Sequence, residues 1–121
     1  MRELTSHKVG GLNEALRIEV LDEPGPGGAN HNYQIWGTAP GGTLGQYISF
    51  QEGPIQEAGV NGISNESLLA IVEDRLKGFQ SGDFACRENA LALTKIQEAM
   101  MWLHKRTRDR ISRGVEGANQ E

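Results

Sequence analysis

The chain has little of what most catalytic and secreted proteins depend on. Its 121 residues include a single cysteine, Cys86, which excludes an internal disulfide and fits a reducing compartment. The three histidines, His7, His31 and His104, fit no metal-ligand spacing. Nucleophile-elbow and metalloprotease motifs are absent as well. We therefore expect a protein that is not an enzyme, with no metal site and no cofactor.

Long apolar runs are also lacking. No stretch approaches the roughly 18 residues of a membrane span, and no signal-peptide pattern opens the chain. Sixteen acidic residues against twelve basic ones give a net charge of −4, opposite in sign to that of a generic DNA-binding protein. We expect a cytoplasmic protein with no membrane, DNA or RNA partner. A length of 121 residues is typical of one domain, so we expect a single domain over residues 1–121.

Glycine is plentiful in the first half of the chain, together with all four prolines. Between these turn-forming residues lie short runs that alternate apolar and polar side chains, as half-buried strands do. Three of these runs are clear and the fourth is weaker; they cover residues 16–20, 33–36, 47–51 and 55–60. The pattern predicts an antiparallel β-meander of three or four strands within about residues 14–62.

The second half has the 3.6-residue period of helices. Ser64 or Asn65 is expected to cap a helix of about 15 residues. Its apolar face would consist of Leu68, Leu69, Val72, Leu76 and Phe79. A turn at residues 81–83, with Asp83 as a candidate cap, leads to a second helix. Residues 63–113 thus predict an antiparallel helical hairpin, and the whole chain predicts an α+β fold.

The second helix is expected to run from about Phe84 to Ser112 and to be about 42 Å long. Gly114 would end it, and residues 114–121 would form a tail. Its apolar seam would consist of Leu93, Ile96, Met100 and Leu103. The shorter helix can cover only the first half of this seam, so the remainder predicts an obligate oligomer whose minimum unit is a twofold dimer.

Five of the twelve basic residues lie within residues 104–113. Arg106, Arg110 and Arg113 are spaced i, i+4, i+7, which places them on one helical face. Guanidinium groups at this spacing suit a phosphate or pyrophosphate. The alternative is that these cations are solvated and only complement the helix dipole. The residues alone leave both interpretations open.

A second candidate is the turn between the two helices, residues 79–89. Phe79 is either a stacking platform or a plug for the turn, and Asn89 either reads a base edge or faces water. Within one chain Phe79 and Arg106 are about 30 Å apart, so they cannot share a pocket. Two long helices packed antiparallel in a dimer would bring them together into a nucleotide site. The glycine-rich loop 22–31 lacks the lysine of a phosphate loop. It is interpreted as an ordered hairpin connection, with a ligand-binding role as the alternative.

Several segments resemble the Thoeris anti-defence proteins of bacteriophages, the first-described type. These segments are residues 22–31, 50–62, 74–76, 79–80, 85–90 and 106–117, and the likeness runs from about residue 16 to 117. The helical hairpin is also similar to that of the smaller anti-CBASS sponge proteins.

The resemblance implies a sponge that sequesters cyclic ADP-ribose isomers made by TIR-domain enzymes, without cleaving them. It also implies dimers that can assemble into hexamers, and some relatives hold cyclic di- or trinucleotides. By position, Phe79 would stack on the adenine with Arg106 on its other side. Asn89 would be a polar contact, Arg106 and Arg110 would hold the pyrophosphate, and Arg87 is a further candidate contact. The expected location is the host bacterial cytoplasm.

Two other functions compete with the sponge. One is a small phage regulatory or assembly protein whose arginine-rich helix binds nucleic acid or protein. The other is an enzyme that degrades the signal.

Overall fold

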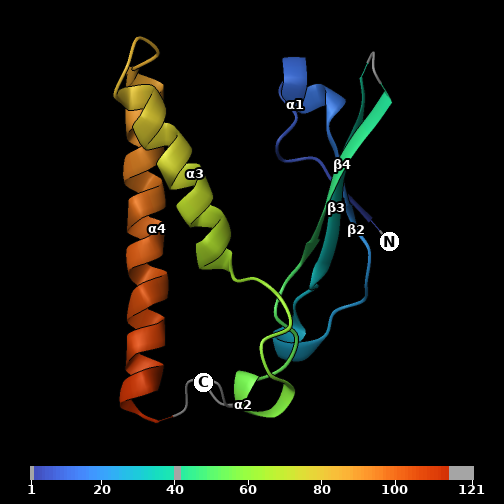
Figure 1. Ribbon diagram of the computed structural model, residues 1–121, viewed down its shortest axis with the longest axis vertical. Coiled ribbons are helices and arrows are strands. Elements are labelled where there is room, and N and C mark those ends of the chain that lie inside the picture. Colours follow the sequence, from blue (N-terminus) through green and yellow to red (C-terminus); the bar gives the residue numbers. More distant parts are fainter. Residues whose placement is uncertain (1, 40–41, 115–121) are drawn as a thin grey trace. The chain divides into compact units, whose positions relative to one another are not determined.

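The computed structural model describes residues 2–39 and 42–114, which fall into two compact units (Figure 1). The sheet unit lies within residues 1–53 and 60–63, and the helical unit takes in residues 54–59 and the chain from Ser64 onward. An antiparallel sheet precedes a helical hairpin along the sequence, which confirms the predicted α+β class. That the two units form one domain stays a prediction.

The sheet unit is a four-stranded antiparallel meander with the order β1-β2-β3-β4. The three clear runs of the sequence correspond to its last three strands, while β1 was not predicted, since it has one apolar residue in three. The register pairs Val20 with Tyr33 and Asn32 with Ser49. The strand bounds are Arg2–Leu4 (β1), Arg17–Val20 (β2), Asn32–Ala39 (β3) and Gly42–Ser49 (β4). The connections include the short helices α1 (Gly11–Ala15) and η1 (Pro26–Gly28).

Val20 on β2 is the fully buried apolar residue of this sheet. Tyr33 and Phe50 pack edge to face with ring centroids 5.6 Å apart. Trp36 donates a hydrogen bond from its indole N–H to Glu19 at 2.7 Å, and the Arg17 guanidinium lies 5.0 Å from the Trp36 ring. Aromatic, polar and charged contacts therefore supplement a small apolar core.

The fourth predicted strand, over residues 55–60, is wrong. Residues Ile55–Ala58 form a short helix, α2, whose amides at Glu57 and Ala58 donate to the Pro54 carbonyl. Gly59 ends it with a φ of 71°, a conformation that glycine adopts without steric cost. The strand-like pairing comes instead from Ile63, which forms a parallel bridge with Phe50.

Two antiparallel helices form the main part of the helical unit. Helix α3 (Asn65–Gln80) is capped by Ser64, as predicted, through reciprocal hydrogen bonds of 3.1 Å with Ser67. Helix α4 (Arg87–Ser112) is about 39 Å long. It begins three residues later than expected, because Cys86 rather than Asp83 caps it: the Cys86 sulfur accepts from the Asn89 amide at 3.4 Å. The predicted tail lies largely outside the described residues.

The covered face of α4 follows alternating steps of three and four residues and includes the whole predicted seam. Its half-buried members on this line are Asn89, Leu93, Ile96, Met100, Leu103, Thr107 and Arg110. No residue of α3 or α4 is fully buried. On α3, Val72 and Phe79 of the predicted apolar face remain 42% and 40% exposed. None of the helices in the described segments has the length and apolar character needed to cross a membrane.

Candidate functional site

The turn between α3 and α4, residues 79–89, is fixed by its own hydrogen bonds, and we call it the tip. The Gln80 side-chain oxygen accepts from the Cys86 amide at 2.9 Å, which closes the turn from one side to the other. Ser81 donates from its hydroxyl to the Gly78 carbonyl at 2.7 Å. Together with the Cys86 cap, these bonds give the side chains of the tip a defined position.

Two aromatic rings lie at the tip. Phe79, in the last turn of α3, is 40% exposed, and Phe84 in the turn is 77% exposed. The Arg75 guanidinium lies 5.5 Å from the centroid of the Phe79 ring. An exposed aromatic beside a cation is a surface on which a nucleotide base can stack. Arg75 was not among the site residues predicted from the sequence, although its i, i+4 spacing to Phe79 is visible there.

Arg87 and Asn89 occupy the first turn of α4. Arg87 is the first residue of the helix and is exposed, whereas Asn89 is half-buried. A cation at a helix N-terminus opposes the helix dipole. The position of Arg87 therefore does not benefit from the helix dipole, and its side chain adds a positive charge to the tip.

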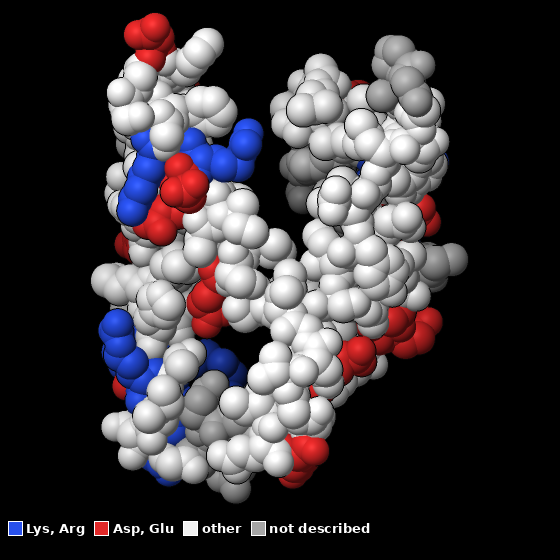
Figure 2. All heavy atoms as spheres, in the orientation of Figure 1, with Lys and Arg blue, Asp and Glu red and all other residues white. Residues whose placement is uncertain are grey.

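The opposite end of α4, residues 104–113, carries the other predicted side chains, and we call it the arginine end. Its one acidic residue, Asp109, forms an ion pair of 2.7 Å with Lys105 and accepts from Arg113 through its carbonyl at 3.4 Å. Arg106 is exposed and Arg110 is half-buried. Five basic residues against one acid leave this end strongly cationic. Figure 2 shows Lys and Arg side chains on both the upper and the lower half of the helical unit.

The tip and the arginine end lie far apart along one helix. Asn89 and Arg106 are separated by 17 residues of continuous α4, which corresponds to about 26 Å. The structure thus brings Phe79, Arg87 and Asn89 together at one end, and Arg106 and Arg110 together at the other. One chain does not join these two clusters, in agreement with the distance argument from the sequence.

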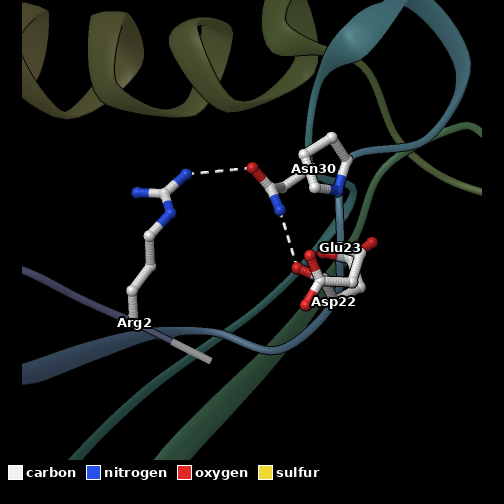
Figure 3. Close-up of a pocket in the computed structure, with 5 residues that line it drawn as sticks. Arg2, Asp22, Glu23 and Asn30 are labelled. Atoms are coloured by element: carbon white, nitrogen blue, oxygen red, sulfur yellow. Dashed lines mark hydrogen bonds between the residues drawn. The ribbon is translucent and has the colours of Figure 1, made fainter.

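In the sheet unit, the connection between β2 and β3 is ordered around the Asp22 side chain. Its carboxylate accepts from the backbone amides of His31 and Asn32 at 3.0 and 3.3 Å, and from the Asn32 side chain at 3.0 Å. Figure 3 shows the Asn30 side chain between Arg2 and Asp22: it accepts from Arg2 at 2.9 Å and donates to the Asp22 carbonyl at 2.7 Å. These contacts agree with the interpretation of loop 22–31 as a structured hairpin connection.

This network also affects the ionisation of Asp22. Partial burial raises the pKa of the carboxyl, but the hydrogen bonds from His31, Asn32 and Asn30 outweigh that effect and hold the pKa below its ordinary value of 3.8. Asp22 is therefore ionised at neutral pH. A small pocket beside it is lined by Arg2, Asp22, Glu23, Pro24 and Asn30.

Comparison with known families identifies the hairpin. A family model described as "Acb2/Tad1, hairpin domain" matches residues 44–108, which is 65 of the 121 residues. The chain belongs to the Acb2/Tad1 family. This confirms the resemblance inferred from the sequence motifs. The matched region contains the whole tip and Arg106, and it ends two residues before Arg110.

A relative in this family is the protein named "Thoeris anti-defense 1" of Bacillus phage SBSphiJ7. It is 54% identical over 74 residues, which cover 61% of this chain and 52% of the relative. The match thus spans about half the length of that Acb2/Tad1 relative.

Proposed function

We propose that this Acb2/Tad1 protein is a phage anti-defence sponge acting in the cytoplasm of the infected bacterium. It binds cyclic ADP-ribose isomers, glycocyclic ADP-ribose among them, that TIR enzymes produce, and it withholds them from the Thoeris effector without cleaving them. Cyclic di- and trinucleotides of CBASS immunity are a second ligand class for the same protein. The name of the phage relative supports the anti-defence role.

The observation that carries the proposal is the placement of two complementary half-sites on one hairpin. The tip offers an exposed aromatic ring and a half-buried amide, Phe79 and Asn89. The arginine end offers Arg106 and Arg110, one helical turn apart. A nucleotide with a pyrophosphate needs both a stacking surface and guanidinium donors, and each half-site provides one of these.

A twofold dimer in which two α4 helices pack antiparallel would unite the half-sites. Residues 97 and 98 lie midway between Asn89 and Arg106 in the sequence. An axis that crosses α4 at this level therefore places Asn89 of one chain beside Arg106 of the other. The same operation generates two identical pockets, one at each end of the pair.

The apolar surface of α4 supports such pairing. Met101 and Trp102, one turn beyond the proposed axis, are 53% and 59% exposed, and Leu91 on the other side of it is 47% exposed. Large apolar side chains gathered on one helix are typical of protein interfaces. A dimer that covers them, alone or within a hexamer, is the assembly that we propose.

Calorimetric titration with a panel of cyclic ADP-ribose isomers tests the proposal directly. We expect Arg106→Ala and Phe79→Ala each to weaken binding by at least about 10-fold, since a base–aromatic stack or a charge-assisted hydrogen bond contributes roughly 1–3 kcal/mol. The matched control is Arg108→Ala, because Arg108 is an equally exposed arginine two residues away and points to another side of α4. Loss of binding in the control to the same extent would refute the assigned site.

Mixing two inactive variants tests whether the pocket lies between chains. A heterodimer of Phe79→Ala with Arg106→Ala has one pocket with both substitutions and one pocket with none. We expect verified heterodimers to bind one ligand with wild-type affinity, whereas each homodimer shows only the weakened affinity of its variant. Heterodimers without any binding would rule out the arrangement across the twofold axis.

Sequestration is distinguished from catalysis by recovery of the ligand. After incubation with excess protein and digestion of that protein by a protease, chromatography should return the cyclic ADP-ribose isomer unchanged. New products that appear in proportion to protein and time would establish an enzyme instead.

The second candidate is a regulatory or assembly protein whose arginine end binds nucleic acid or protein. The excess of five basic residues over one acid in residues 104–113 favours it. A salt-dependent shift of DNA in a gel, without any binding of cyclic ADP-ribose isomers in calorimetry, would support this candidate and contradict the sponge.

A further inference from the structure

Three side chains with metal-ligand chemistry meet at one end of the sheet unit, outside the helical hairpin. Asp22 follows β2, His31 precedes β3 and Glu52 follows β4. The meander brings these ends together, because β2 and β4 both pair with β3 near its start, at Val20–Tyr33 and Asn32–Ser49. In sequence the three residues are far apart, which is why histidine spacing predicted no metal site.

The ligand atoms are close to one another. One ring nitrogen of His31 and one carboxylate oxygen each of Asp22 and Glu52 all lie within 4.8 Å of one another. Two atoms that bind one zinc ion at about 2.1 Å are at most about 4.2 Å apart. Glu52 is exposed, so its side chain can move inward by the remaining fraction of an ångström without disturbing packing.

His31 supplies the second, independent observation. Its side chain is buried, with the residue only 7% exposed, and its Nδ1 atom is shielded from water with no hydrogen-bond partner among the residues that the structure describes. The ring lies against the backbone of Gly25, where an added Cβ would be 3.5 Å from Nδ1. A buried ring nitrogen without a partner is costly, and coordination of a cation by this nitrogen would remove that cost.

The charges at this end of the sheet point the same way. The Asp22 carboxylate is fixed by three hydrogen-bond donors, which orient it as outer-shell contacts orient metal ligands. Glu52 is tied in place through its backbone, which exchanges hydrogen bonds of 2.8 Å with the Asn61 side chain. Two carboxyl groups and one imidazole thus lie together at this end of the sheet, and these are groups that bind a divalent transition-metal ion.

We propose that Asp22, His31 and Glu52 bind a divalent transition-metal ion of the zinc class. One imidazole and two carboxylates suit zinc, whereas magnesium and calcium prefer sites built from oxygen alone. Three protein ligands leave a fourth position for water. The ion fastens the β2–β3 loop to the segment after β4, so its role is to stabilise the sheet unit.

The test uses the full chain carrying Cys86→Ser, which removes the exposed thiol as a competing zinc ligand while serine retains the helix cap. After treatment with a chelator and dialysis, zinc chloride is titrated against a chromophoric chelator, and thermal unfolding is followed. We expect one zinc ion per chain and, at 100-fold excess over its Kd, a rise in Tm of at least about 5 °C. Magnesium and calcium chloride should give no rise.

Glu52→Gln is the decisive variant, because the side chain is exposed and its backbone contacts remain. It should weaken zinc affinity at least about 10-fold. The matched control, Glu14→Gln, removes an exposed carboxylate from the same unit and should leave the affinity unchanged. His31→Gln, checked for folding by circular dichroism, should abolish binding. A zinc affinity equal in Glu52→Gln and the control, or no zinc-dependent rise in Tm, overturns the proposal.

Discussion

Asp22 organises a turn that the sequence marks only by its glycines and prolines. Three donors converge on its carboxylate, and two of them are the backbone amides of His31, just before β3, and of Asn32, the first residue of β3. Amino-acid composition locates the loop but does not predict this arrangement, because nothing in the sequence shows that Asn30 and Asn32 contact Asp22. The consequence is a carboxyl group whose pKa is lowered and whose ionised form contributes to stability.

The first prediction concerns pH. Because the folded-state pKa of Asp22 is lowered, its stabilising contribution is present above the unfolded value and is lost as the pH falls through the folded value, below about pH 4. Asp22→Asn cannot ionise there. We expect the Tm difference between wild type and Asp22→Asn to be largest near neutral pH and to shrink below about pH 4.

This measurement is made with a chelator present, so that bound metal does not contribute. Glu23→Gln serves as the control, since it removes the adjacent carboxylate and should show no such pH dependence. A Tm difference for Asp22→Asn that stays constant down to pH 3 would contradict the prediction.

Gly62 gives a second prediction at the scale of single residues. A Cβ at this position would lie 2.6 Å from both the Phe50 carbonyl oxygen and the Gln51 amide nitrogen, where backbone cannot give way easily. Gly62→Ala should therefore lower the free energy of unfolding by about 1–3 kcal/mol. The control is Gly82→Ala, where nothing lies within 4 Å of the added carbon. Urea denaturation of both variants would check this, and equal stabilities would refute it.

The spacing of apolar residues predicted the secondary structure of long segments well and that of short segments poorly. The strands β2, β3 and β4 and both hairpin helices follow patterns visible in the sequence. The run 55–60 is too short for its pattern to distinguish a strand from a helical turn. Pro54 precedes and Gly59 follows the residues that form α2. Cys86 replaced Asp83 as the cap of α4 because cap choice depends on how the turn closes, here through Gln80.

The cap of α3 provides a prediction at this scale. Ser64 and Ser67 satisfy each other's backbone amides at 3.1 Å. Ser64→Ala removes one of these bonds and should destabilise the helical unit by roughly 0.5–2 kcal/mol. Ser64→Asp, which restores an acceptor and adds favourable charge at the helix N-terminus, should recover most of the loss. Circular dichroism during urea unfolding measures both, and an unchanged Ser64→Ala would contradict the capping role.

At the scale of the whole molecule, the sequence predicted that the tip and the arginine end lie at opposite ends of α4, because this follows from counting along helices. It did not predict the contact of Arg75 with Phe79, which depends on side-chain orientation. It also did not predict the meeting of Asp22, His31 and Glu52, because that depends on strand register. Periodicity locates residues along an element, whereas contacts between elements require the fold.

The dimer proposed from α4 leads to the last prediction. Trp102 is 59% exposed. In the proposed dimer the partner chain buries this side chain, and a charged side chain at the same position would disfavour that contact. Trp102→Asp should yield monomers in light scattering and weaken ligand binding together with assembly. The control Ile71→Asp places the same charge on α3 at a position that is also 59% exposed. Dimers that persist in Trp102→Asp would contradict pairing through this face.

The separation of Asn89 from Arg106 by 17 positions along α4 has a consequence for how such a protein would work inside a cell. If a complete receptor exists only in a pair of chains, ligand capture depends on the square of monomer abundance at low expression and becomes linear once pairing saturates. By mass action, each captured molecule in turn draws subunits together. Under the proposed function, an infecting phage would therefore gain protection sharply, at a threshold of synthesis, rather than in proportion to every copy made.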